Sequence, residues 1–305
     1  MSEAYPRDLV GYGANPPHAN WPEGARLALS FVLNYEEGGE ACVLDGDPAA
    51  EAYLQEVPGI PPLAGQRNLS VESIYEYGAR AGFWRIRRLF VERDLTLTVY
   101  AVGQALERNP EAARAMVEAG FEVASHGWRW IDYQNVPEAE ERAHIQRAIE
   151  AIERATGQRP VGWYTGRVGP NTRRLVAEAG DFLYDSDSYA DDLPYWLTVA
   201  GRPHLVIPYT LDNNDMKFGL LNGFNHGEEF FQYLRDAFDV LYEEGAREPK
   251  MMSVGLHCRL VGRPGRAAAL TRFLDYARSH DAVWITTRAE IARHWHANHP
   301  YQAAA

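Results

Sequence analysis

The chain has 305 residues, of which 46% are hydrophobic, and its formal net charge is -12. This length and apolar content are typical of a globular protein that buries a large core, and they exclude a largely disordered chain. The excess of acidic residues disfavours binding to the phosphates of nucleic acid and docking on anionic membranes.

The cysteines and the apolar runs indicate where the protein works. Cys42 and Cys258 form no Cys-x-x-Cys pair, so neither a zinc ribbon nor a redox motif is predicted. The N-terminal stretch lacks an apolar run, and no window is long and apolar enough to cross a membrane, which requires about 18 residues or more. We expect a cytoplasmic protein with ordinary reduced thiols.

Strands and helices alternate along the chain. The first apolar run, residues 26–35, is short and rich in Leu, Phe and Val, which predicts a buried strand. The Gly- and Pro-rich segment 38–70 follows and predicts a long functional loop, such as a lid or an oligomer contact. Helices are then expected at residues 83–93, 110–120, 137–155, 170–180, 228–244, 264–279 and 287–297. Strands are expected between them, at residues 95–102, 121–126, 161–165, 182–186, 205–209, 250–258 and 282–286.

The repeated order of strand and helix predicts a parallel sheet covered by helices. With about seven or eight such units, a closed barrel is favoured over an open doubly wound sheet. No G-x-G-x-x-G sequence follows an early strand, which disfavours a dinucleotide-binding fold. We predict a single α/β barrel catalytic domain over residues 1–305, with an N-terminal extension at 1–25 and an insertion loop at 38–70.

Polar side chains recur at the C-terminal ends of the predicted strands, the face that carries the active site in α/β barrels. These polar clusters lie at residues 34–37, 125–128, 165–167, 185–187 and 257–259. Turns at the opposite ends of the strands lack such clusters. The sequence therefore predicts a functional site at one rim.

Two glutamates and two histidines are the candidate catalytic groups. A Glu-Glu pair is normally a solvated turn, but Glu36 and Glu37 follow a buried strand and precede two glycines. A partly desolvated carboxylate has a raised pKa and can act as general base toward water. His126 and His257 each end an apolar strand; alone each would be an ordinary core histidine, but on one rim they fit general acid work and oxyanion stabilisation.

The spacing around His126 disfavours a metal site. Two histidines at i and i+4 beside a carboxylate would predict a zinc site, but position 130 is Trp130 and its neighbour is the cation Arg129. We predict no metal and no other cofactor.

The motifs resemble those of the polysaccharide deacetylase family (carbohydrate esterase family 4) over roughly residues 26–297. Within that family they look most like the cofactor-independent allantoinases. The stretches that carry this resemblance are FVLNYEEGGE, EVASHGWRWIDYQ, GWYTGRVGPNTRRL, LYDSDSYADDLPYW and SVGLHCRLVGRPGR. The resemblance implies a distorted (β/α)7 barrel and a homotetramer.

The resemblance also implies roles for individual residues. Glu36 matches the family's catalytic base and Glu37 its metal-binding aspartate, whereas Trp130 replaces the second histidine of a His-x-x-x-His motif that begins at His126. An Arg-centred motif matches Arg167, a further motif spans residues 185–196, and a Leu-His pair that supplies the general acid matches His257. Substrate binding is assigned to Glu37, Trp130, Tyr164, Arg167 and Asp185.

The activity that the resemblance implies is hydrolysis of the hydantoin ring of allantoin to allantoate. In this hypothesis Glu36 activates water, His257 protonates the departing ring nitrogen, and His126, Trp130 or backbone N–H groups stabilise the oxyanion. The expected partners are the small-molecule substrate allantoin and further copies of the chain, with no nucleic acid and no membrane.

Other functions remain open at this point. Another cyclic imide or hydantoin would fit the same residues, and a metal-dependent polysaccharide deacetylase is disfavoured by the missing histidine. A non-catalytic binding module is a further alternative, although such a protein would be expected to lose polar groups at several rim positions, and these are all retained.

Overall fold

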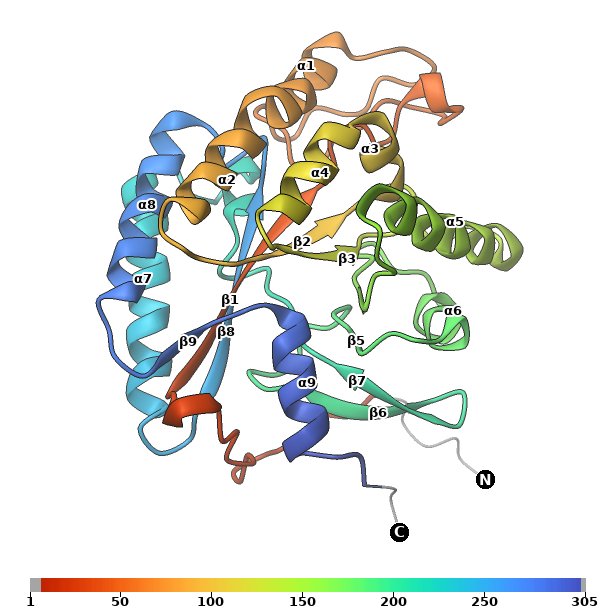
Figure 1. Ribbon diagram of the computed structural model, residues 1–305. Helices are drawn as coiled ribbons and strands as arrows, with labels where there is room; N and C mark the ends of the chain where they lie inside the picture. Colours follow the sequence, from red (N-terminus) through yellow and green to blue (C-terminus); the bar gives the residue numbers. More distant parts are fainter. Residues whose placement is uncertain (1–6, 303–305) are drawn as a thin grey trace.

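A computed structural model describes residues 7–302 of the chain. Its centre is strand β1 (Leu27–Tyr35), in which all nine residues are buried. Strand β8 (Lys250–His257) runs parallel to β1 along its whole length, and the two strands cross the middle of the molecule side by side (Figure 1). Their register ends with Asn34 beside His257, so two of the predicted polar clusters meet at one rim.

The other strands extend the sheet outward from β1. The order is β6-β7-β5-β4-β3-β2-β1-β8, and β9 pairs with the first part of β1. All neighbouring strands are parallel except the β6–β7 hairpin. The bounds are β2 Thr98–Ala101, β3 Glu122–Ser125, β4 Gly162–Trp163, β5 Tyr184–Asp185, β6 Tyr195–Val199, β7 Arg202–Val206 and β9 Val283–Ile285. Because these strands are parallel, their C-terminal ends gather at one rim.

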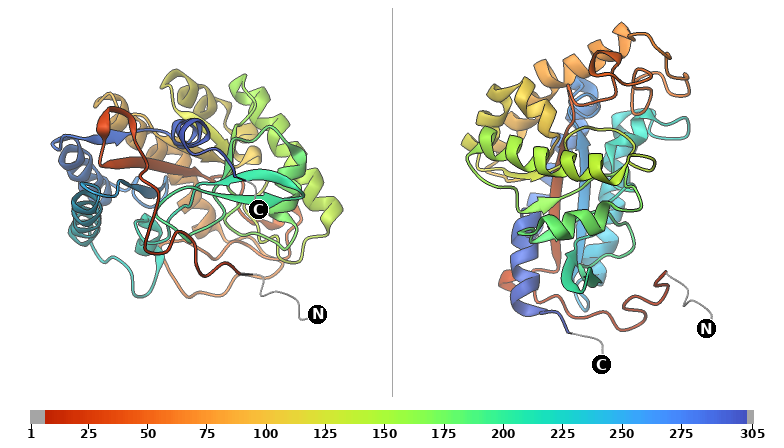
Figure 2. Two further views of the ribbon diagram at one scale, coloured as in Figure 1. Left: turned by 90° about the horizontal axis from the view of Figure 1, so that it is seen from below. Right: turned by 90° about the vertical axis from the view of Figure 1, so that its right-hand side faces the viewer.

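Helices surround the curled sheet on its outer side (Figures 1 and 2). Their bounds are α1 Leu69–Tyr77, α2 Phe83–Val91, α3 Gly103–Arg108, α4 Pro110–Glu118, α5 Glu138–Thr156, α6 Thr172–Ala179, α7 Gly227–Glu244, α8 Pro264–Arg278 and α9 Arg288–Asn298. The core between sheet and helices is aromatic: Phe31 of β1 makes edge contacts with Phe90 of α2 and Phe273 of α8. Amphipathic helices bury their apolar stripes in this way.

The prediction of an α/β barrel of the distorted type is confirmed, but the sheet does not close as a regular barrel. Among the described residues, the only pairing across the gap between β8 and the segment after β7 is the bridge Asn214↔Gly255. Pro208 follows β7 and has no backbone N–H, which prevents that strand from continuing into a ladder. The sheet is therefore a curled half-barrel.

Most predicted elements are present within a few residues, and the differences are local. The hairpin strand β6, with the sequence YWLTV, was not predicted. Helices α1 and α3 were also missed, as was the π-helical segment Gly78–Gly82 that joins α1 to α2. In the segment predicted as a long loop, residues 38–70, the structure has the short 3-10 helix Val43–Asp45 and two isolated bridges before α1 begins at Leu69.

None of the helices in the described part of the chain is long and apolar enough to cross a membrane. The single catalytic domain over residues 1–305, with its N-terminal extension 1–25, stays a prediction, and residues 1–6 and 303–305 lie outside the described residues.

Candidate active site

A cavity of about 410 Å³ opens at the rim where the C-terminal ends of the strands meet. The insertion loop 38–68 contributes to its wall. The lining residues are Asn34, Glu36, Tyr53, Leu54, His126, Trp130, Asp132, Tyr164, Gly166, Arg167, Tyr189, Tyr209, Leu211, Asn214, Met216 and His257. Six of the eight predicted site residues line this cavity, and the two that do not are Glu37 and Asp185.

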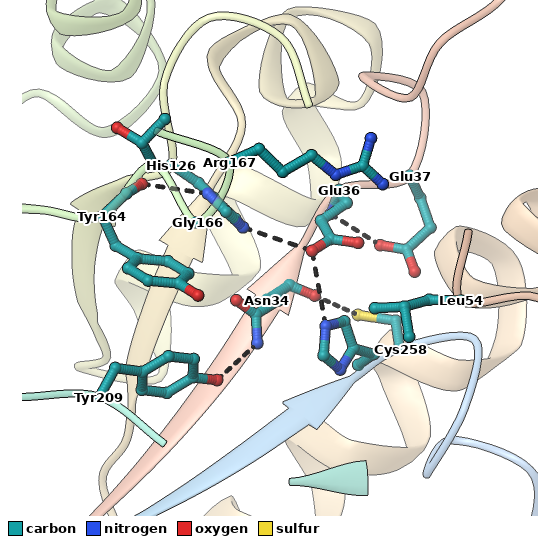
Figure 3. Close-up of polar contacts among 12 residues, drawn as sticks. Asn34, Glu36, Glu37, Leu54, His126, Tyr164, Gly166, Arg167, Tyr209 and Cys258 are labelled. Atoms are coloured by element: carbon teal, nitrogen blue, oxygen red, sulfur yellow. Dashed lines mark hydrogen bonds and ion pairs between the residues drawn. The ribbon is translucent and has the colours of Figure 1, made fainter. Parts of the chain in front are cut away.

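Glu36 lies at the centre of the site, directly after β1, with 1% of its surface exposed. Its Oε1 atom is 3.3 Å from Nε2 of His126 (Figure 3). The same atom is 3.5 Å from Nε2 of His257. Its Oε2 atom is 2.7 Å from Nη1 of Arg259, a fully buried guanidinium. One carboxylate therefore meets three basic side chains from two other strand ends.

These neighbours keep Glu36 ionised. Burial by itself raises the pKa of the Glu36 carboxyl, but the charges of Arg259 and His257 and hydrogen bonds from His126 and His257 outweigh burial. The pKa of Glu36 is held well below its usual value. The ionised form is the one that a general base needs.

His257 is held as a cation by a buried acid. Its Nδ1 atom is 2.6 Å from Oδ1 of Asp215, and Oδ2 of Asp215 accepts the backbone N–H groups of His257 and Val261. Burial alone would lower the pKa of His257, but Asp215 and Glu36 together raise its pKa to about 9. At neutral pH the ring therefore carries a proton on Nε2 that it can donate.

His126 has one nitrogen committed to the backbone. Its Nδ1 lies 3.1 Å from the carbonyl oxygen of Tyr164, which can only accept, so Nδ1 carries a proton. The other nitrogen, Nε2, is the one that faces Glu36 and the cavity. The backbone bond orients the ring toward the carboxylate, as second partners of catalytic histidines do.

Glu37 does not face the cavity, which corrects its assignment to substrate binding. Glu37 lies in the turn that follows β1, where the N–H of Gly39 donates to the carbonyl oxygen of Glu36, and Glu37 does not line the cavity. Its Oε2 atom accepts the backbone N–H of Glu36, and its side chain packs against Gly78, where a β-carbon would overlap it. Burial and the charge of Glu36, only partly offset by Arg259, raise the pKa of Glu37 to about 7.

Asp185 is also placed differently from the prediction. It ends β5, but it is 1% exposed and does not line the cavity. Its carboxylate accepts a hydrogen bond from Nε of Arg173 at 3.0 Å and another from His204. These partners commit Asp185 to holding the strand end together rather than to contact with a substrate.

Arg167, Trp130 and Tyr164 line the cavity as predicted for substrate contacts. The Arg167 guanidinium lies 3.8 Å from the centroid of Trp130 and 5.1 Å from that of Tyr53. Its Nη1 donates to Oε2 of Glu51 at 3.1 Å, whereas its Nη2 is buried without a hydrogen-bond partner. Arg167 therefore links the insertion loop to the strand end and presents one donor that a ligand could satisfy.

The sequence interpretation missed several residues of the site. Arg259 was seen in a polar cluster but given no role, although it directly follows Cys258 on the same rim. Asp215 gave only a weak signal, because it lies in a polar run between strands. Tyr209 ends a predicted strand, so the rule used for the other clusters could have identified it.

Comparisons with known proteins identify the family. The profile of the family described as "Polysaccharide deacetylase" matches residues 66–185. A putative polysaccharide deacetylase of Schizosaccharomyces pombe is 46% identical, over 97% of this chain and 99% of that protein. The chain belongs to the polysaccharide deacetylase family.

Solved structures of this hydrolase family confirm the fold at high similarity. The crystal structure of a probable polysaccharide deacetylase from Pseudomonas aeruginosa PAO1 is 65% identical, with a TM-score of 0.96. The crystal structure of PuuE allantoinase is 63% identical, also with a TM-score of 0.96. Each comparison covers 98% of this chain and 100% of the other.

The residues at this site do not fit the metal ion that the family resemblance implies. Trp130 takes the place of the second histidine and stacks on Arg167. The carboxylate pair already meets a cation, since Nη1 of Arg259 lies 2.7 Å from Glu36 and 3.6 Å from Glu37. In the described part of the chain, no three His, Cys, Asp or Glu side chains are grouped so as to hold a metal ion.

Proposed function

We propose that this protein is an allantoinase that opens the hydantoin ring of allantoin by metal-independent general acid–base catalysis. The observation that carries the proposal is the pairing of an ionised Glu36 with a protonated His257 in one cavity. Two titratable groups held in opposite states are the arrangement that acid–base hydrolysis requires. The 63% identity to PuuE allantoinase, over nearly the whole chain, supports the choice of substrate.

The reaction begins with water beside Glu36 and His126. Glu36 takes a proton from this water as its oxygen attacks the ring carbonyl, giving a tetrahedral intermediate. His257 then donates its Nε2 proton to the ring nitrogen as the carbon–nitrogen bond breaks. The product is the open ureido acid. The proton on Glu36 then passes through solvent to His257, which restores the ionised carboxylate and the protonated ring.

The cavity walls suit a small, polar and uncharged ring. Trp130 and Tyr164 present aromatic surface, whereas Asn34 and Arg167 offer hydrogen-bonding groups. In this assignment Glu36, His257 and His126 are the catalytic residues, and Trp130, Tyr164 and Arg167 contact the substrate. The buried, unpartnered Nη2 of Arg167 is a donor for a substrate carbonyl.

Allantoin hydrolysis by purified protein, with and without prior chelation, tests the proposal. We expect turnover that survives chelation in protein shown by elemental analysis to be metal-free. Activity lost on chelation and restored by zinc would contradict the metal-independent mechanism. Activity on hydantoin, dihydropyrimidines or succinimide but not on allantoin would retain the chemistry and replace the substrate.

Glu36→Gln tests the assignment of the base. Loss of a general base lowers kcat by about 10²–10⁴-fold. The same change at the neighbouring Glu37, whose carboxyl lies outside the cavity, is expected to cost far less. Near-normal turnover by a correctly folded Glu36→Gln protein would show that Glu36 is not the base.

The homotetramer and the cytoplasmic location stay predictions.

A further inference from the structure

Tyr209 places a hydroxyl group in the wall of the cavity, across Asn34 from the catalytic carboxylate (Figure 3). It follows β7 and is 6% exposed. Its ring is held by edge contacts with Tyr100 at 5.3 Å and Tyr164 at 4.8 Å between centroids. Aromatic packing of this kind leaves the hydroxyl little freedom of position.

The hydroxyl oxygen accepts hydrogen bonds from amide groups whose orientation is determined. Nδ2 of Asn34 donates to Tyr209 at 2.8 Å and to the carbonyl oxygen of Leu256 at 3.1 Å. Because a backbone carbonyl only accepts, the atom that faces Tyr209 must be the amide nitrogen.

Asn214 is oriented in the same way. Its Nδ2 donates to the carbonyl oxygen of Thr210 at 3.0 Å, and its Oδ1 accepts the backbone N–H of Met216 at 2.9 Å. The same Nδ2 makes a longer contact of 3.5 Å with the Tyr209 hydroxyl. Both amides therefore direct N–H groups at the phenolic oxygen.

The proton of Tyr209 must then point elsewhere. Within residues 7–302 the Tyr209 hydroxyl donates no hydrogen bond to another residue, and Tyr209 lines the cavity, where a ligand could supply the acceptor. Accepting N–H bonds polarises an O–H group and strengthens it as a donor. Burial, the largest effect, raises the pKa of Tyr209 well above its usual value, although the Asn34 bond opposes this, so the group stays protonated.

We propose that Tyr209 donates the hydrogen bond that stabilises the oxyanion, with Asn34 and Asn214 as positioning residues. Asn34 and Glu36 are two residues apart at the end of β1, so their side chains lie on the same side of the sheet. A ring carbonyl between them would meet water on the Glu36 side and the Tyr209 hydroxyl at its oxygen. Tyr209 keeps its proton throughout, and only the hydrogen bond strengthens as charge develops.

This inference rests on the proposed function and deepens it. Among the donors suggested by the sequence, which also include backbone N–H groups, His126 faces Glu36 through Nε2, and Arg167 covers the ring face of Trp130. The Tyr209 hydroxyl accepts hydrogen bonds from two amides, and its own proton is free to be donated to a ligand.

Tyr209→Phe is the test, because it removes the hydroxyl and keeps the ring. Loss of one oxyanion donor lowers kcat by about 10²–10³-fold, and we expect KM for allantoin to change little. Tyr100→Phe is the matched control: it removes a hydroxyl from the same aromatic cluster, but Tyr100 does not line the cavity. The control should keep wild-type kcat.

Each outcome decides the matter. The inference would be overturned if Tyr209→Phe left kcat unchanged or only raised KM. It would also be overturned if both variants lost the same share of kcat, because the effect would then come from packing. If Tyr209→Phe lowers the melting temperature, a second variant with 3-fluorotyrosine at position 209 is measured. This variant keeps both the ring and the hydroxyl, so the inference requires it to retain wild-type kcat. A wild-type protein without allantoin turnover would instead contradict the proposed function itself, and the role of Tyr209 would fall with it.

Discussion

At the scale of single residues, the site works by separating the protonation states of neighbouring groups. Asp215 is completely buried and has two backbone donors and the His257 ring as partners, so its negative charge is directed at one imidazole. Arg259 acts on Glu36 from the opposite side. The carboxylate stays ionised and the imidazole stays charged because each is surrounded by the opposite sign.

The pH dependence of kcat/KM follows from these pairs. Activity needs protonated His257, whose pKa is about 9, so it is present below that pH and is lost as the pH rises through about 9. It also needs ionised Glu36, and because the pKa of Glu36 is held well below 4.5, the acidic limb should lie below that value. We expect a broad plateau through neutral pH.

Asp215→Asn tests the cause of the basic limb. An amide removes the negative charge and can donate to Nδ1, which favours the neutral ring and should move the basic limb to lower pH by about 1–3 units. Asp212→Asn makes the same change on an exposed side chain of the same segment and should leave the profile unchanged. A basic limb that does not move in Asp215→Asn would show that another group is the acid.

At the scale of elements, the insertion loop is held over the rim by ion pairs. Four acidic residues of the loop each meet an arginine from the barrel: the pairs are Asp45–Arg108, Asp47–Arg129, Glu51–Arg167 and Glu56–Arg266. Exposed ion pairs contribute little, but the Glu51 side chain is only 6% exposed, so its pair is screened less by solvent. The loop, which was predicted to be a lid or an oligomer contact, thus carries one ion pair that also orients a residue of the cavity.

Glu51→Gln should weaken substrate binding rather than chemistry. Loss of about 1–2 kcal/mol from this charge-assisted contact corresponds to a rise in KM of about 5–30-fold, with kcat nearly unchanged. Glu72→Gln is the control: it breaks the more exposed pair between Glu72 of α1 and Arg67, and it should leave KM unchanged. A fall in kcat without a change in KM would contradict the role of the loop in binding.

At the scale of the whole molecule, Arg288 connects the two sides of the open sheet. This arginine, at the start of α9, is fully buried and donates to Ser30 of β1, Ser253 of β8 and Ser186 next to β5. It also donates to the carbonyl oxygens of residues 207 and 208, beyond the end of β7. Side-chain bonds in the interior thus replace the strand pairing that is missing across the gap.

Arg288→Met should therefore destabilise the fold. Several buried acceptors would lose their donor, and we expect the free energy of unfolding in urea to fall by about 2–4 kcal/mol. Arg293→Met, on the exposed face of the same helix, should change it by less than about 0.5 kcal/mol. Equal stability of the two variants would mean that the interior network does not hold the sheet together.

The sequence by itself determined the alternation of strands and helices and the rim on which Glu36, His126 and His257 meet. It could do so because the spacing of apolar residues and the Gly and Pro signals that end each element are local features. In addition, parallel strands place their C-terminal ends together. Only the tertiary structure decided that Glu37 and Asp185 turn away from the cavity, that Asp215 and Arg259 face His257 and Glu36, and that Tyr209 presents a free proton. Those contacts join segments far apart in the chain, and their orientation depends on packing and hydrogen-bond partners that no local pattern records.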